Sequence, residues 1–171
     1  MKRGQVWIEV VIYTLIAFVM MGVVLGIARP KIQELQDKAI IEQSILMVNE
    51  IDAIIKEIVQ GGPGNQRVIN LGIKKGTLKI DGVEDKIIFE VEGNYLYSEP
   101  GADVVEGNLI ISTEKIGKFN KVILTRDYIG EYDITYQMND ELKLIGKSSM
   151  PYNMVISNKG GNEIVIDFNI N

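Results

Sequence analysis

Few residues in this chain are of the types that usually carry out catalysis. The sequence contains no cysteine and no histidine, so the common zinc ligands and nucleophile–base pairs lack their most frequent members. Three carboxylates fall in one predicted turn, Asp81, Glu84 and Asp85, and carboxylates bind calcium, but the EF-hand spacing is absent. The run Lys147-Ser148-Ser149 contains the elements of a Ser–Lys pair, but nothing in the sequence supplies an oxyanion site.

These observations argue against an enzyme. We interpret the turn acids as solvated, and we expect no catalytic residue, no metal site and no cofactor. The glycine-rich run 61–64 is not followed by Lys-Ser/Thr, so it is not a phosphate-binding loop. A net charge of −5 disfavours a nucleic-acid partner.

The acid with the most informative position is Glu9. It precedes nineteen residues without a charge, from Val10 to Ala28, and Arg29-Pro30 closes the run. Nineteen helical residues span about 28 Å, which is close to the thickness of a bilayer hydrocarbon core. A helix is the only way for a single segment to cross, because lipid offers the backbone no hydrogen-bond partner. A lone carboxylate beside such a segment is costly and therefore indicates a function.

The apolar run does not fit an ordinary secretory signal. Such signals have an apolar core of about 7–15 residues followed by a small-residue cleavage site. This run is longer, and Arg29-Pro30-Lys31 follows it. A plain anchor helix explains the hydrophobicity but does not explain the residues upstream, where Lys2-Arg3-Gly4-Gln5 leads into Glu9.

The order of these residues resembles the N-terminus of type IV pilin-like proteins, most closely the archaeal prepilins with a class III signal peptide. In that family a membrane peptidase cuts after a glycine preceded by basic residues and leaves the apolar helix on the mature chain. Here Lys2 and Arg3 match the leader, and Gly4 matches the glycine. Gln5 would then be the first mature residue, and Glu9 would be the fifth. The resemblance covers residues 2–59.

A physical hypothesis for Glu9 follows from cleavage at Gly4. The cut would create an α-amine at Gln5, which is mostly cationic at neutral pH. We expect Glu9 of one subunit to pair with the Gln5 amine of its neighbour in a helical assembly, so that neither charge is buried alone. Two alternatives stay open: Glu9 lies at the headgroup level and needs no partner, or Gln5 cyclises to pyroglutamate and the amine is lost.

Three residues mark a joint in the predicted helix. Gly22, Gly26 and Pro30 are four apart and share one face, and the first two can let another helix approach closely. Pro30 has no N–H and clashes with the carbonyl of Gly26, so we expect a kink or a short melted turn around residues 26–30. Its role is either a flexible joint for transfer from bilayer to filament or none.

Beyond Pro30 the helix becomes amphipathic. Apolar residues follow three/four spacing and acids and lysines lie mostly between them, which predicts a stripe covered by the chain's own sheet and partly by another subunit. The stripe consists of Ile32, Leu35, Ala39, Ile41, Ile45, Val48, Ile51, Ile55, Ile58 and Val59. The run Gly61-Gly62-Pro63-Gly64 ends the helix.

From Arg67 onward the apolar pattern has a period of two, and turn signals recur at close intervals. We expect strands at 68–73, 77–80, 86–92, 95–99, 104–113, 119–125, 132–137, 141–145, 152–157 and 163–170, and the segment 104–113 is interrupted at Gly107-Asn108. Hairpins are expected at Gly93-Asn94 and at 158–162. Several tyrosines fall in these strands, and we expect them to pack in the core; they are Tyr95, Tyr97, Tyr132, Tyr136 and Tyr152.

The predicted fold is α+β: a leader at 1–4, a long helix at 5–59 with its membrane or filament-core part at 10–28, and an antiparallel β-sandwich-like domain at 60–171. The resemblance implies a prepilin made in the membrane with its N-terminus inside, cut by a prepilin peptidase and polymerised at the cell surface. It also implies an assembly ATPase and a membrane platform protein as partners. The runner-up is an uncleaved, single-pass anchored binding or adhesion module.

Overall fold

The computed structural model describes the backbone of residues 2–170 and the side chains of residues 6–170. It contains one long helix, α1 (Lys2–Gln60), followed by ten strands. The chain divides into two compact units, residues 1–36 and residues 37–171. The fold is therefore α+β with a sandwich-like β domain, as the change of apolar period predicts.

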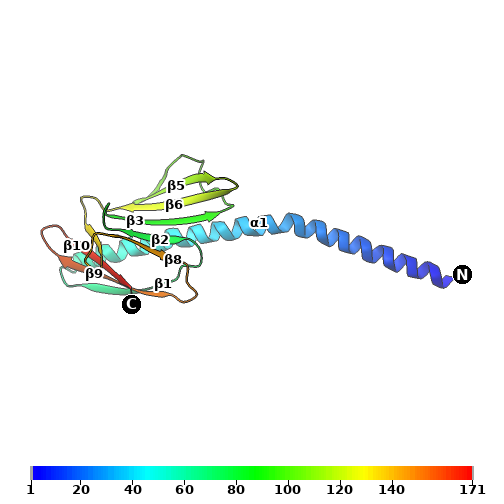
Figure 1. Ribbon diagram of the computed structural model, residues 1–171, viewed down its shortest axis with the longest axis horizontal. Coiled ribbons are helices and arrows are strands. Elements are labelled where there is room, and N and C mark those ends of the chain that lie inside the picture. Colours follow the sequence, from blue (N-terminus) through cyan, green and yellow to red (C-terminus); the bar gives the residue numbers. More distant parts are fainter. Residues whose placement is uncertain (1, 171) are drawn as a thin grey trace. The chain divides into compact units, whose positions relative to one another are not determined.

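Ten strands form two sheets in the second unit (Figure 1). The four-stranded sheet has the order β1-β9-β10-β7, and the six-stranded sheet has the order β4-β5-β6-β3-β2-β8. The strands are β1 (Gln66–Leu71), β2 (Thr77–Asp81), β3 (Lys86–Gly93), β4 (Val104–Glu106), β5 (Leu109–Ile116), β6 (Phe119–Asp127), β7 (Asp133–Tyr136), β8 (Leu142–Gly146), β9 (Tyr152–Gly160) and β10 (Val165–Ile170).

The pairing is antiparallel except between β10 and β7, which are parallel. The expected C-terminal hairpin is confirmed, because β9 pairs with β10 in antiparallel register. The expected strand at 95–99 and its hairpin at Gly93-Asn94 are wrong. Both edges of β3 are already occupied, by β2 and by β6, so a strand at 95–99 has no free edge there to pair with.

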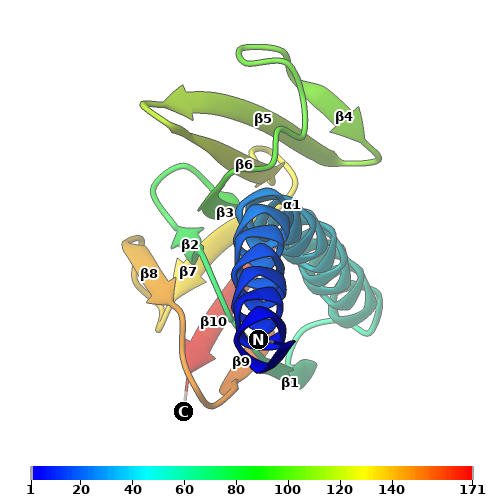
Figure 2. The same cartoon turned by 90° about the vertical axis from the view of Figure 1, so that its right-hand side faces the viewer.

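The second half of α1 lies between the two sheets (Figure 2). The apolar stripe of α1 packs against both sheets and forms a single hydrophobic core with them. Beyond Asp37, six residues of the stripe are almost completely buried. These are Ile41, Ile45, Val48, Ile51, Ile55 and Ile58. Ile32, Leu35 and Ala39 of the predicted stripe are exposed. The sheets contribute Phe89, Leu124, Ile156 and Phe168 among others.

The end of α1 is where the glycine-rich run predicts it. The helix ends at Gln60, and Gly62 and Gly64 adopt left-handed backbone angles that L-residues with a side chain rarely take. The amide of Asn65 donates to the carbonyls of Gly61 and Gly62, which satisfies backbone groups at the helix end.

At Pro30 the backbone stays helical, as it does at every residue from Lys2 to Gln60. The short melted turn expected at residues 26–30 is therefore absent, and the kink stays a prediction. A helix can continue past a proline when only one backbone hydrogen bond is lost, at a cost of roughly 3 kcal/mol.

The tyrosines pack against the core, but fewer of them lie in strands than expected. Tyr136 in β7 is buried, and Tyr152 in β9 is half-buried. Tyr95, Tyr97 and Tyr132 lie outside the strands and pack against the core from loops.

Candidate functional site

Among the side chains that the structure describes in residues 6–36, the apolar part of α1 has no partner. Every residue from Val6 to Ile27 is exposed, and Trp7, Phe18 and Ile27 expose 77%, 67% and 71% of their surface. The segment is long and apolar enough to cross a membrane, and none of its most apolar window is buried. A helix that is apolar all round needs lipid or other protein around it, because burying such surface is worth roughly 25 cal/mol per Å².

One polar side chain inside this segment, Thr14, is satisfied within the helix. Thr14 donates its hydroxyl to the carbonyl of Val10 at 2.7 Å, so this hydroxyl needs no partner outside the helix. Gly22 and Gly26 leave open space, because a Cβ built on either would meet no atom within 4 Å. The two glycines therefore lie on a free face at which another helix can approach closely.

The predicted processing site is only partly visible. Gly4 and Gln5 are helical in backbone, as are Lys2 and Arg3, but their side chains lie outside the residues that the structure describes. Glu9 is exposed on the helix, and among the described side chains it forms no ion pair. The hypothesis that Glu9 pairs with the Gln5 amine of a second copy stays a prediction.

A buried ion-pair network holds the second half of α1 in the sheets. Arg126 on β6 donates from Nε to Asp52 of α1 at 2.8 Å and from a terminal nitrogen to Glu131 at 2.8 Å. Lys56 bonds the second carboxylate oxygen of Asp52 at 2.6 Å, and Tyr128 donates its hydroxyl to Asp52 at 3.2 Å. The Arg126 guanidinium also lies 4.2 Å from the Tyr128 ring centre. These groups satisfy one another, which is the condition for charge in a protein interior.

A second buried acid fastens the first turn of the helix within this unit. Asp37 accepts from Lys75 at 2.5 Å and from the backbone N–H of Asn94 at 2.7 Å. Gly93 lies so close that a Cβ there would be 2.6 Å from the carboxyl carbon of Asp37. The contact therefore requires glycine at position 93.

These acids are the residues that the sequence interpretation missed. Asp37 and Asp52 belong to the acids and lysines that the three/four pattern sets mostly between the apolar positions, but they are 6% and 8% exposed. The signal was present in their spacing: Asp37 precedes Ile41 by four residues, and Asp52 follows Val48 by four, so both are in phase with the buried stripe.

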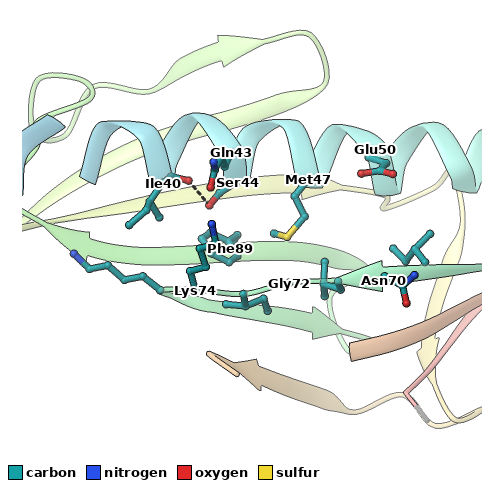
Figure 3. A pocket seen from close by; sticks show the side chains of 13 residues that line it. Ile40, Gln43, Ser44, Met47, Glu50, Asn70, Gly72, Lys74 and Phe89 are labelled. Atoms are coloured by element: carbon teal, nitrogen blue, oxygen red, sulfur yellow. Dashed lines mark hydrogen bonds between the residues drawn. The ribbon is translucent and has the colours of Figure 1, made fainter. Parts of the chain in front are cut away.

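A cavity of about 200 Å³ lies between α1 and the β1–β2 segment (Figure 3). Ile40, Ser44 and Met47 point from the helix towards Phe89. The Ser44 hydroxyl donates to the carbonyl of Ile40, and no buried side-chain polar atom among the described residues lacks a partner. The cavity therefore offers space but no unpaired buried group that would select a ligand.

The acidic turn has a structural role that the solvated interpretation did not include. Asp81 accepts from the N–H groups of Val83 and Glu84, and half-buried Asp85 accepts from the N–H of Ile134. Burial and the charges of Asp140, Asp85 and Glu163 raise the pKa of nearby Asp133. Within the described part of the chain, no three acids converge in a way that would hold a metal ion. The run Lys147-Ser148-Ser149 lies in the β8–β9 loop.

Comparison of the chain with protein-family models, with curated proteins and with solved structures finds no match.

Proposed function

We propose that the chain is a pilin-like structural subunit, made as a single-pass membrane precursor and polymerised through its apolar helix. The observation that carries the proposal is the apolar surface of residues 6–27, which is exposed around the whole circumference of the helix. Such a surface is stable in lipid or in a bundle of identical helices, and it is unstable in water.

The N-terminal pattern separates a filament subunit from a simple anchor. A permanent anchor needs only the apolar run. The resemblance of Lys2-Arg3-Gly4-Gln5 and Glu9 to a prepilin junction adds cleavage after Gly4, a prepilin peptidase, an assembly ATPase and a platform protein. It also places the N-terminus inside and the β domain outside the cell.

In the assembled state the apolar helices would form the filament core. The open face at Gly22 and Gly26 would allow close helix approach, and Glu9 would pair with the Gln5 amine of a neighbour. Once the charges are paired, burial of the apolar side chains holds the subunits together outside lipid.

Co-expression of the full chain with a prepilin peptidase tests the proposal. We expect mass spectrometry of the wild-type chain to show loss of residues 1–4 and the Gly4→Val variant to keep them. Gly72→Val, in an open loop position far from the junction, is the matched control and should be cut normally. An intact N-terminus in the wild type, with monomers in detergent, would instead support the anchored binding module.

A further inference from the structure

The β domain has lysines and exposed apolar side chains together at one end. The tip of the β5–β6 hairpin, made of the turn and the strand residues beside it, has the sequence Lys115-Ile116-Gly117-Lys118-Phe119. Ile116 and Phe119 expose 47% and 52% of their surface, and both lysines are exposed. An isoleucine and a phenylalanine exposed at one hairpin tip form a small apolar patch that a lipid surface or a partner can cover.

A second loop presents the same combination. The β8–β9 loop carries Lys147 and Met150, and Met150 is 77% exposed. The N–H of Ser148 in this loop donates to the carbonyl of Ile73, which ties it to the β1–β2 loop and its exposed Lys74.

Strand register places these loops at one end of the six-stranded sheet. Gly93, at the end of β3, pairs with Asn120 just after the β5–β6 turn. Thr77, at the start of β2, pairs with Gly146 just before the β8–β9 loop. Asp37 contacts both places, through Asn94 and Lys75. The lysine-bearing loops therefore lie at the end of the domain where α1 begins to pack on the sheets; we call it the entry end.

The opposite end of the same sheet has the opposite charge. Exposed Val83 and Ile129 lie there in turns that also carry Glu84, Asp85 and Asp127. The cation Lys86 at this end is paired with Glu84, so the acids are in excess. At the entry end, Lys74, Lys115, Lys118 and Lys147 form no ion pair with any side chain that the structure describes. Two strand acids near this end, Glu92 and Glu114, lie opposite Lys121 in the strand register.

We propose that the entry end is a peripheral membrane-binding surface that seats the β domain on anionic lipid headgroups. The apolar tips Ile116, Phe119 and Met150 would enter the headgroup region, and the four unpaired lysines would lie among the lipid phosphates. Only eight residues, 29–36, separate the apolar run from Asp37. The inference rests on the membrane-inserted state of the proposed function, and it adds a second contact that holds the precursor before assembly.

Charge complementarity selects the partner. Each lysine close to an anionic bilayer surface strengthens binding by about fivefold at moderate salt, and the effect disappears within a Debye length. The acidic opposite end would be repelled by the same surface. The domain would therefore have one preferred orientation on an anionic membrane.

The test uses the full chain in lipid vesicles and its natural lack of cysteine. A single Phe119→Cys variant is labelled with an environment-sensitive dye, and Val83→Cys at the opposite end is the matched control. We expect the label at position 119 to shift to the blue and to be quenched by brominated lipid in vesicles containing phosphatidylglycerol. It should stay aqueous in pure phosphatidylcholine and at high salt, and the label at position 83 should stay aqueous throughout.

Trp7, the single tryptophan, reports helix insertion independently. If brominated lipid quenches Trp7 but the label at position 119 stays aqueous in anionic vesicles, the proposed surface is wrong and the membrane anchor stands. If Trp7 is not quenched, both proposals are wrong. Met150→Cys is a second reporter in case the Phe119 variant folds poorly, and Lys115→Gln/Lys118→Gln should weaken the response of either label by about tenfold or more.

Discussion

The ion pair between Asp52 and Arg126 should account for a large part of the attachment of α1 to the six-stranded sheet. Arg126 is 4% exposed, and its Nε lies 2.8 Å from the carboxylate of Asp52. Removing one partner of a buried pair typically costs about 3–5 kcal/mol, because the other charge is left buried. In Arg126→Gln, Asp52 keeps its contacts with Lys56 and with the hydroxyl of Tyr128. We therefore expect the free energy of unfolding to fall by about 2–3 kcal/mol.

Arg67→Gln is the matched control. Arg67 on β1 also pairs with an acid of α1, Glu57, at 2.5 Å, but both side chains are more than half exposed. Water and salt screen such a pair, so Arg67→Gln should lower the free energy of unfolding by less than about 1 kcal/mol.

Urea unfolding of the full chain in mild detergent, followed by near-ultraviolet circular dichroism of the tyrosines, measures both variants. If the free energy of unfolding falls by about 1.5 kcal/mol per M urea, the midpoint should fall by about 1.3–2 M for Arg126→Gln and by less than about 0.7 M for Arg67→Gln. Equal midpoints for the two variants would refute the reasoning that burial makes the first pair more important.

The same network predicts a pH dependence. Burial by itself raises the pKa of Asp52, but hydrogen bonds and charge from Lys56 and Arg126 outweigh it and hold the pKa below its ordinary value. A carboxyl with a lowered pKa in the folded state stabilises the fold above its unfolded-state pKa, near 3.9, and loses that contribution as the pH falls through the folded-state pKa. Acid unfolding below about pH 4 should therefore be sharper in the wild type than in Asp52→Asn.

Two further substitutions test other contacts. Gly93→Ala should destabilise the domain by about 1–3 kcal/mol, because its Cβ would overlap the carboxyl of Asp37. Gly146 lies at the end of β8, and a Cβ there would meet no atom within 4 Å. Gly146→Ala is therefore the control and should change the urea midpoint little. Asp133→Asn should raise the melting temperature at pH 7, because the raised pKa of Asp133 means that its ionised form is disfavoured in the folded state. The gain in melting temperature should vanish below about pH 4, where the carboxyl is protonated in both states. A gain of the same size at both pH values would contradict this cause.

The sequence predicts the elements well where one physical signal dominates. The uncharged run and the three/four spacing predict one helix ending at the glycine-rich run, and α1 ends at Gln60. The alternation of apolar and polar residues, together with the turn residues, predicts the bounds of most strands to within a few residues. These signals are local, because helix and strand periods are properties of consecutive residues.

The predictions are wrong where the structure of a segment depends on residues far away in the sequence. The segment 95–99 has strand-like residues, but β2 and β6 already occupy both edges of β3. Asp37 and Asp52 look like surface acids until Lys75 and Arg126, tens of residues away, supply their partners. Each acid lies four residues from a buried position of the stripe, but spacing alone does not identify the distant cation that stabilises a buried carboxylate.

Of the functional surfaces described above, one could be predicted from the sequence and one could not. Exposure of the apolar segment follows from its composition, since a helix that is apolar all round cannot be covered by one small domain. The charge difference between the two ends of the β domain does not follow from composition. It depends on which turns the strand register brings together, and Lys118 and Lys147 are far apart in the sequence.

The most direct test of the central claim is a cryo-electron microscopy reconstruction of surface filaments from cells that produce this chain. The account predicts that residues 10–28 of each copy lie at the filament axis, enclosed by the same residues of neighbouring copies, and that the first ordered residue is Gln5. Filaments built without this chain, or a chain found solely in the membrane with residues 1–4 still attached, would contradict it.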